Sequence, residues 1–550
     1  MMPSTRALAL CALLSGPALL SQEPDATVPA PPEVVEPVSF VTEHEGVFGA
    51  AGSEEPMRYR ATAGELHLRN EEGQPTAAVF SFTYERLPID RKRPVTFVFN
   101  GGPGSASVWL HMGVFGPRRV VVPSEADGDD GAAPFEIVDN PLSVLDLTDL
   151  VFIDPVGTGF SRVVGQGDEK DFYGLVEDAR SIAQFVRRWI TENQRWNAPK
   201  YLAGESFGTT RAAAVTAELA RGGQNLALNG LILISQALDY TGSTPSPDNL
   251  IAHVTYLPTM ALTARYHGKG RTDLSVEELA EESRRFATDV LAPALFKGST
   301  LADEERERVA EELAALLGLE RDYVLRANLR VTVPRFTKEL LRDRGVAVGR
   351  LDSRYVADEA DDNADSARLG DAASNAISSA YTAALQEVLA TELEVTMDRP
   401  YLTSGSVGSK WRWRPVPDGT FWEPSYVNTA RWLSDGLRTN ADLRVLVANG
   451  YYDLITPFFD AEYTFARHDI LADRVQMTYY EAGHMMYVRQ ADFVQLVRDV
   501  REFLAGELAG PGPGPRSRRR LRVSRCERRT AAPIRGCGAP RGRGPARCRG

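Results

Sequence analysis

Between residues 60 and 240, short apolar runs rich in β-branched side chains alternate with segments of helical periodicity. This alternation constrains the fold more than any other feature, because a strand, a crossing helix and a second strand form a parallel pair. It predicts an α/β fold with a mostly parallel central sheet flanked by helices. The helical segments are residues 172–191 and 207–220, and the runs expected to be buried strands are Val95–Phe99, Asp149–Asp154, Tyr201–Ala203 and Gly230–Ser235.

After residue 240 the composition changes to stretches rich in Ala, Glu and Leu, and strand patterns return only near the end of the chain. We therefore expect a helical insertion, or cap, over residues 241–395. It divides the α/β core into a first part, residues 46–240, and a second part, residues 396–509. The expected elements are helices at 277–286, 303–317 and 376–391, strands at 443–448 and 475–480, and a closing helix at 492–504.

The two ends of the chain differ from the rest in composition. Residues 1–21 combine Arg6 with an apolar run and small residues, which is typical of a signal peptide and favours a secreted or periplasmic protein. Residues 22–45 are Pro-rich and acidic and are expected to be a linker. Residues 510–550 consist mainly of Arg, Gly and Pro with almost no large apolar side chains, so we expect a disordered tail.

Charge and cysteine usage exclude several classes of function. The net charge is −12, but the 13 Arg and single acid of residues 510–550 leave a net charge of −24 on the rest of the chain. A body this acidic is a poor nucleic-acid binder. No apolar run reaches the about 20 residues that cross a bilayer, so we expect no membrane span. The four cysteines lie at position 11 and beyond 525, which excludes a disulfide, a thiolate metal site and a catalytic cysteine in the body.

The segment Gly204-Glu-Ser206-Phe-Gly208 matches the Gly-x-Ser-x-Gly pattern of a nucleophile elbow. By itself this pattern is weak, and an ordinary strand–helix turn would explain it. Here it follows an expected strand and opens an Ala-rich helix, which is the context that such an elbow needs. The helix N-terminus would supply amides and a positive dipole end where an oxyanion develops. We therefore take Ser206 as the candidate nucleophile.

A nucleophile elbow requires an acid and then a histidine further along the chain. Four histidines follow Ser206, and His484 is the one that lies in a loop after the last expected strand. Asp453 follows the preceding strand and is the candidate acid. Alone it would be read as a surface turn residue. Of the other histidines, His253 and His267 fall in or near the insertion, and His468 is expected to pack or face solvent. The trio predicts acyl-enzyme chemistry without metal or cofactor.

A second oxyanion donor is expected from Asn100-Gly-Gly-Pro-Gly104, directly after the strand that ends at Phe99. The glycines allow a backbone amide to turn into the site. A phosphate-binding loop is excluded, because the segment lacks the lysine and the spacing of that motif.

Four segments together resemble the serine carboxypeptidase family, the S10 peptidases, over roughly residues 60–505. The resemblance implies an α/β-hydrolase fold with a helical insertion and the triad Ser206, Asp453 and His484. It also implies oxyanion amides at Gly102 and Phe207, and capture of the peptide substrate's C-terminal carboxylate by Asn100 and Glu205. The segments are Phe99-Asn-Gly-Gly-Pro-Gly-Ser-Ala-Ser107, Asp154-Pro-Val-Gly-Thr-Gly-Phe-Ser161, Gly204-Glu-Ser-Phe-Gly208 and Gly483-His-Met485.

The carboxylate site departs from the family pattern at two positions. Many members have Trp where this chain has Val98, and Glu, paired with the residue before the serine, where it has Val114. Burial beside the nucleophile should raise the pKa of Glu205, so that its protonated form donates a hydrogen bond to a carboxylate. Glu205 could instead be a purely structural elbow residue.

Three functions remain open at this level. The first is a secreted or periplasmic serine carboxypeptidase that releases C-terminal residues from peptides. The second keeps the triad but acts as an esterase, amidase or acyltransferase, which Val98 and Val114 allow. The third, a non-enzymatic binding protein on a hydrolase fold, is disfavoured by a complete triad. The sequence does not determine side-chain specificity or oligomeric state.

Overall fold

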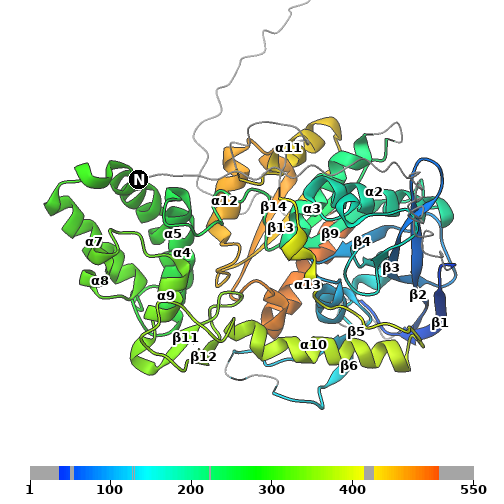
Figure 1. The fold of residues 1–550 in the computed structure, drawn as a ribbon, viewed down its shortest axis with the longest axis horizontal. Coiled ribbons are helices and arrows are strands. Elements are labelled where there is room, and N and C mark those ends of the chain that lie inside the picture. The colour runs from blue at the N-terminus through cyan, green and yellow to red at the C-terminus, as the bar shows by residue number, and fades with distance from the viewer. Residues whose placement is uncertain are drawn as a thin grey trace, which may run out of the picture. The chain divides into compact units, whose positions relative to one another are not determined.

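A ten-stranded sheet forms the centre of the protein (Figure 1). The computed structural model describes residues 36–49, 55–126, 128, 131–221, 225–413 and 426–506. The strand order is β1-β2-β3-β7-β4-β9-β10-β13-β14, and β8 pairs with β3 off this path. The bounds are β1 Ser39–Gly46, β2 Met57–Arg69, β3 Pro75–Arg86, β4 Val95–Phe99, β7 Asp149–Ile153, β8 Arg162–Val163, β9 Lys200–Glu205, β10 Gly230–Ile234, β13 Arg444–Gly450 and β14 Val475–Tyr480.

The sheet has an antiparallel part and a parallel part. Strands β1, β2 and β3 pair antiparallel, and β3 pairs antiparallel with β7. From β7 onward every neighbouring pair is parallel. β4, β7 and β10 are buried throughout, as expected for parallel strands covered on both faces. This mostly parallel sheet with helices confirms the predicted α/β class, and it is the α/β-hydrolase fold.

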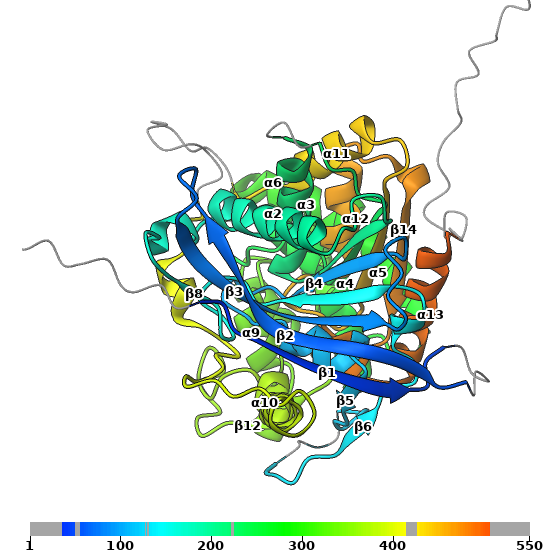
Figure 2. The same cartoon turned by 90° about the vertical axis from the view of Figure 1, so that its right-hand side faces the viewer.

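Helices cover both faces of the sheet (Figure 2). On one face α2, α3 and α11 pack their apolar side chains against Phe97, Leu202 and Val445 of the strands. On the other face α10 and α13 pack against the cluster that contains Val98 and Ile232. The bounds are α2 Leu175–Glu192, α3 Phe207–Ala220, α10 Ala372–Thr391, α11 Ala430–Thr439, α12 Phe458–Arg467 and α13 Gln490–Ala505.

The helices between β10 and α10 form a separate group, seen apart from the sheet in Figure 1. They enclose their own apolar core, which reaches the α/β core through Tyr452, Leu454 and Phe458. The Tyr256 hydroxyl of α4 donates to the Ile455 carbonyl at 3.2 Å, which ties the group to the loop after β13. The bounds are α4 Leu250–Tyr266, α5 Val276–Phe286, α6 Ala292–Lys297, α7 Asp303–Leu317, α8 Arg321–Arg326 and α9 Val333–Glu339.

Two predicted boundaries differ from the structure. The predicted linker ran to residue 45, but Ser39–Gly46 is strand β1, held by its ladder to β2. The predicted insertion ran to residue 395, yet α10 packs its Ala-rich face into the core cluster of the sheet and not into that of the cap helices. The predicted signal peptide and the Arg-rich tail lie outside the described residues.

Small elements complete the described chain. A short helix, α1, continues directly into one π-helical turn of residues 111–115. Within the described residues, no helix is both long and apolar enough to cross a bilayer. The bounds are α1 Val108–Leu110, β5 Arg118–Val120, β6 Ile137–Asp139, β11 Val346–Val348 and β12 Val356–Asp358.

Candidate active site

Ser206 lies on a sharp turn between β9 and α3. Its backbone has φ 60° and ψ −129°, a conformation that costs a non-glycine residue about 1–3 kcal/mol and that marks functional turns. The Ser206 N–H donates to the Ile234 carbonyl at 3.0 Å, which fixes the turn to the neighbouring strand. A Cβ on Gly204 would lie 2.3 Å from the Gly208 carbonyl oxygen, so only glycine permits this close approach of strand and helix. The turn is therefore a nucleophile elbow in geometry as well as in sequence.

His484 and Asp453 come together from the loops after β14 and β13. The Nδ1 atom of His484 lies 2.7 Å from Oδ2 of the fully buried Asp453. Because a carboxylate only accepts, Nδ1 carries the proton, and Nε2 is the nitrogen that can accept one from Ser206. The other Asp453 oxygen accepts the N–H groups of Ile455 and Thr456 at 2.7 and 2.9 Å. The acid is thus held before any substrate binds.

The charge of Asp453 controls the titration of His484. Burial of the imidazole lowers its pKa, but the Asp453 carboxylate, helped by Glu205 and Asp371, outweighs burial and raises the pKa above its ordinary value. Two backbone bonds hold the loop: the His484 N–H donates to the Leu351 carbonyl at 2.7 Å, and the Ser235 hydroxyl donates to the His484 carbonyl at 2.6 Å. An imidazole held this way is a suitable general base.

The other three histidines have partners away from Ser206. The His253 ring contacts the Pro247 carbonyl, and the His267 ring contacts the Ser353 carbonyl. His468, expected to pack or face solvent, is partly buried, and its ring lies 2.7 Å from the Asp239 carboxyl. None of these residues lines the cavity that contains Ser206.

The loop after β4 lies directly against the elbow, because β4 and β9 are neighbours in the sheet. A Cβ on Gly101 would lie 2.5 Å from the Phe207 amide nitrogen. Phe207 is the first residue of α3, so its N–H has no acceptor within the helix. Gly102 follows with φ 100° and lines the same cavity. Both predicted oxyanion donors are therefore placed beside Ser206.

The two predicted carboxylate-binding residues, Asn100 and Glu205, line the cavity as well. The Asn100 amide oxygen accepts the Leu110 N–H at 3.1 Å, which leaves its NH₂ group to act on the Glu205 carboxyl. The Asn100 carbonyl accepts from Arg211 at 2.5 Å, and Arg211 in turn bonds Asp178 at 2.6 Å. A buried ion pair between α2 and α3 thus supports the loop.

Glu205 is almost fully buried beside the nucleophile. Burial raises its pKa to about 7, although His484, the Tyr487 hydroxyl and the Asn100 amide favour the ionised form. Tyr487 donates to Oε2 of Glu205 at 2.7 Å. At mildly acidic pH the carboxyl is neutral and can donate a hydrogen bond. The structure agrees with the direction of pKa shift that the sequence predicted.

These residues surround a cavity of about 380 Å³. One wall comes from α10, which brings Ser374, Ile377 and Ser378 over the site. Within the described chain, no Lys or Arg lines this cavity, so His484 is the one described lining side chain that can carry a positive charge. The remaining lining residues are Gly101, Pro103, Gly104, Ser105, Trp109, Leu351, Ser404, Gly405, Ile455 and Met485.

Sequence reasoning missed several of these residues. Ile377 and Leu351 come from segments assigned to the insertion, and Tyr487 from the chain after His484. Met485 lies in the motif Gly483-His-Met485, but the motif predicts no role for it. Contacts over such separations leave no local pattern in one sequence. The only available signal was that Tyr487 lies three residues after the predicted base.

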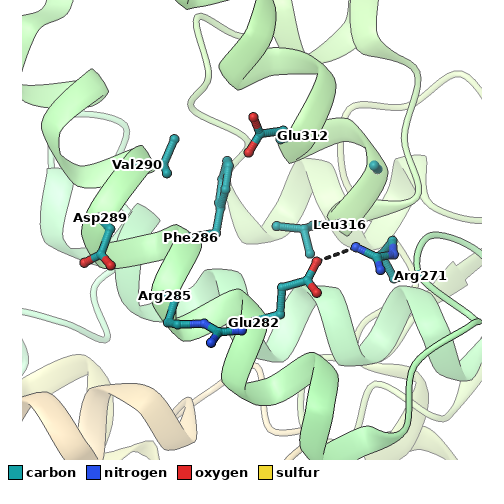
Figure 3. Close-up of a pocket in the computed structure, with 9 residues that line it drawn as sticks. Arg271, Glu282, Arg285, Phe286, Asp289, Val290, Glu312 and Leu316 are labelled. Carbon is teal, nitrogen blue, oxygen red and sulfur yellow. Dashed lines mark hydrogen bonds and ion pairs between the residues drawn. The ribbon is translucent and has the colours of Figure 1, made fainter.

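A second cavity, of about 410 Å³, lies among the cap helices (Figure 3). Phe286 and Leu316 lie at its centre, and Arg271 pairs with Glu282 at its edge. The other lining residues are charged or apolar, and no described residue that lines it is a Ser, Thr, Cys or His. Its described lining therefore offers no hydroxyl, thiol or imidazole group. Among the described residues no cluster of His, Cys, Asp and Glu could hold a metal ion either.

One protein-family model matches part of the chain. Residues 53–263 match the family model described as serine carboxypeptidase. Over these residues the chain is similar to the serine carboxypeptidase family. The matched region includes Asn100, Glu205 and Ser206, whereas Asp453 and His484 lie beyond it. For the acid and the base, the support is the 2.7 Å contact between His484 and Asp453.

Curated relatives of the family are distant. "Serine carboxypeptidase-like 13" from Arabidopsis thaliana is 24% identical over 213 residues, which is 38% of this chain and 46% of the relative. "Pheromone-processing carboxypeptidase KEX1" from Cryptococcus gattii is 30% identical over 146 residues, 26% of this chain and 20% of the relative. The matches thus span less than half the length of these relatives.

Solved structures with similarity to the chain include hydrolases. A carboxyl esterase from Bacillus coagulans has a TM-score of 0.33 at 12% identity, covering 81% of this chain and 98% of the esterase. A proline iminopeptidase from Mycobacterium smegmatis has a TM-score of 0.32 at 15% identity, covering 79% of this chain and 98% of the iminopeptidase.

Proposed function

We propose that this protein is a serine carboxypeptidase that releases C-terminal residues from peptides through an acyl-enzyme. The observation that carries the proposal is one cavity that combines the nucleophile elbow of Ser206, the His484–Asp453 pair and the buried Glu205–Asn100 pair. The first two provide acyl-transfer chemistry. The Glu205–Asn100 pair provides neutral hydrogen-bond donors for a carboxylate. No Lys or Arg of the described chain lines the cavity.

The chemistry follows from the positions of the groups. Nε2 of His484 takes the Ser206 proton as Oγ attacks the scissile carbonyl, and Asp453 stabilises the imidazolium. The resulting oxyanion accepts hydrogen bonds from the Gly102 and Phe207 amides. His484 then donates its proton to the departing amine, which leaves an ester on Ser206. Water, deprotonated by His484, attacks this ester and restores the serine.

The leaving group explains the requirement for a carboxylate site. The departing residue carries the C-terminal carboxylate, and that carboxylate must lie a fixed distance from the scissile bond. Asn100 donates through its amide, and protonated Glu205 donates through its carboxyl O–H. Glu205 directly precedes Ser206, so this contact aligns the terminal peptide bond with the nucleophile. An internal peptide bond has no carboxylate at that position.

A second candidate uses the same triad on a substrate without a carboxylate, as an esterase, amidase or acyltransferase. The observation in its favour is that Val98 and Val114 are completely buried and apolar where many family members have Trp and Glu. The two candidates differ only in the leaving group that the cavity accepts.

The test is digestion of an N-blocked tripeptide, with the products identified by mass spectrometry. The proposal predicts loss of the C-terminal residue first, no reaction with the Ser206→Ala variant, and labelling of Ser206 by a fluorophosphonate. If Ser206 is labelled and the protein hydrolyses simple esters but not the tripeptide, the second candidate is favoured. Absence of labelling in a folded protein would contradict both.

We further propose that the protein acts outside the cytoplasm, as a secreted or periplasmic enzyme. The support is the composition of residues 1–21. N-terminal sequencing of protein recovered from the producing cells and from their medium tests this. An intact N-terminus on cytoplasmic protein would contradict it.

A further inference from the structure

A tyrosine outside the predicted site holds the carboxyl group of Glu205. The Tyr487 hydroxyl donates to Oε2 of Glu205 at 2.7 Å, and the Tyr487 side chain is 1% exposed. Tyr487 belongs to the 3-10 turn Met486–Val488, which directly follows His484 and Met485. One short segment thus supplies both the candidate base and the partner of Glu205.

The Tyr487 ring occupies the space next to the residue where the family acid is missing. A Cβ on Gly113 would lie 2.5 Å from the ring atom Cε2 of Tyr487, so the ring packs directly on that glycine. The following residue, Val114, is fully buried and apolar and offers Glu205 no hydrogen bond. Tyr487, from the C-terminal part of the chain, therefore gives Glu205 a hydrogen bond that Val114 cannot give.

We propose that Tyr487 is a positioning residue of the carboxylate site, whose hydroxyl fixes one oxygen of Glu205 and directs the other toward the substrate's C-terminal carboxylate. This inference rests on the proposed carboxypeptidase function and adds a residue to it. A donor on Oε2 leaves Oε1 as the oxygen that carries the proton when Glu205 is neutral. The Asn100 amide and this O–H then form the donor pair for the substrate.

The groups around Glu205 determine how the contact behaves with pH. His484, Asp453 and Tyr487 are the titratable groups that act on Glu205, and Tyr381 of α10 acts on Tyr487. Burial raises the pKa of Tyr487 well above its ordinary value, so the hydroxyl remains a donor whenever the enzyme works. The donated bond favours the ionised form of Glu205. Removing it should therefore raise the pKa of Glu205 and widen the range in which Glu205 is protonated.

The variant Tyr487→Phe removes the hydroxyl and keeps the ring against Gly113. Tyr480→Phe is the matched control, because the Tyr480 hydroxyl donates to another buried carboxyl, Asp499, at the same 2.7 Å. Infrared spectra of the ¹³C-glutamate-labelled full chain report the protonated carboxyl of Glu205, identified by its loss in Glu205→Gln. We expect the titration midpoint to rise by about one to two pH units in Tyr487→Phe. We expect no change in Tyr480→Phe.

Kinetics with two substrates separates positioning from general stability. For an N-blocked dipeptide with a free C-terminus, Tyr487→Phe should raise KM about tenfold with kcat within about twofold. For the same dipeptide with an amidated C-terminus, KM should not change. If Tyr487 had a purely structural role, Tyr487→Phe would change KM for the free-acid and the amidated dipeptide by the same factor. Tyr480→Phe would then change KM for the two substrates in the same way.

The outcomes distinguish this inference from the function on which it rests. One result would overturn only the inference about Tyr487. In that result the wild type prefers the free acid, and Tyr487→Phe keeps both this preference and the infrared titration midpoint of the wild type. A wild type without preference for the free acid overturns the carboxypeptidase function and, with it, carboxylate positioning by Tyr487.

Discussion

The protonation state of Glu205 should control whether the enzyme accepts a free C-terminus. Burial raises the pKa of Glu205 to about 7. Below that pH the carboxyl is neutral and, in the proposed reaction, donates a hydrogen bond to the substrate's carboxylate. Above it the carboxyl ionises, and two negative charges face each other in a cavity whose described lining contains no Lys or Arg. Binding of the free acid should therefore be lost as the pH rises through about 7.

The size of the effect follows from that pKa. The neutral fraction of Glu205 is about 0.9 at pH 6 and about 0.1 at pH 8, so productive binding should fall about tenfold over this interval. His484 acts in the opposite direction. Its raised pKa means that it must lose a proton as the pH rises before it can act as a base. Because His484 serves every substrate, dividing kcat/KM for the free acid by kcat/KM for a matched ester removes its contribution.

The assay measures this ratio between pH 5 and pH 8.5. Glu205→Gln replaces the carboxyl by an amide that is neutral at every pH, and its ratio should not depend on pH. Glu85→Gln is the matched control, since burial also raises the pKa of Glu85, which lies outside the cavity and contacts Arg195 at 3.4 Å. This control should keep the decline of the wild type. A flat ratio in the wild type, or a decline that persists in Glu205→Gln, would refute the reasoning.

Three further substitutions test the surroundings of the nucleophile. Asp453→Asn should lower kcat about 10³- to 10⁴-fold, because the imidazolium of His484 loses its partner, and stopped-time assays showing less than a tenfold loss would contradict this. Gly101→Ala places a Cβ 2.5 Å from the amide nitrogen of Phe207, a proposed oxyanion donor, and should lower kcat at least about 100-fold; unchanged kcat in a folded protein would remove this loop from the proposed site. Arg211→Ala leaves the Asp178 carboxyl buried without its partner and should lower the free energy of unfolding by about 3–5 kcal/mol, measured by denaturant titration at pH 7. A loss below about 1 kcal/mol would contradict this last prediction.

The sequence predicted the parallel half of the sheet well because burial on both faces produces continuous apolar runs. β4, β14 and α3 have the predicted bounds, and α7 does as well. Strand β1 was missed because its residues alternate between exposed and partly buried positions and are largely polar. Its stability comes from the ladder to β2, a long-range contact that composition does not indicate.

The candidate site divides in the same way. Ser206, Asp453 and His484 could be predicted because each follows a recognisable strand and the chain order of such residues is known. Glu205 and Asn100 could be predicted because they belong to family motifs at the ends of predicted strands. Tyr487 could not be predicted, because its partner is 282 residues away and the contact depends on how the π-helical turn packs. The position of α10 over the cavity likewise depends on tertiary packing, since its composition resembles that of the cap helices.

The central claim is that the cavity binds a C-terminal carboxylate beside an active serine. The most direct test compares release of the C-terminal residue from an N-blocked dipeptide with release from the same dipeptide amidated at its C-terminus, at pH 5 and pH 7.5, with Ser206→Ala as the control. We predict release that depends on Ser206 and is faster for the free acid than for the amide, with a larger preference for the free acid at pH 5 than at pH 7.5. Equal or faster turnover of the amide at both pH values would contradict the claim and favour an esterase, amidase or acyltransferase.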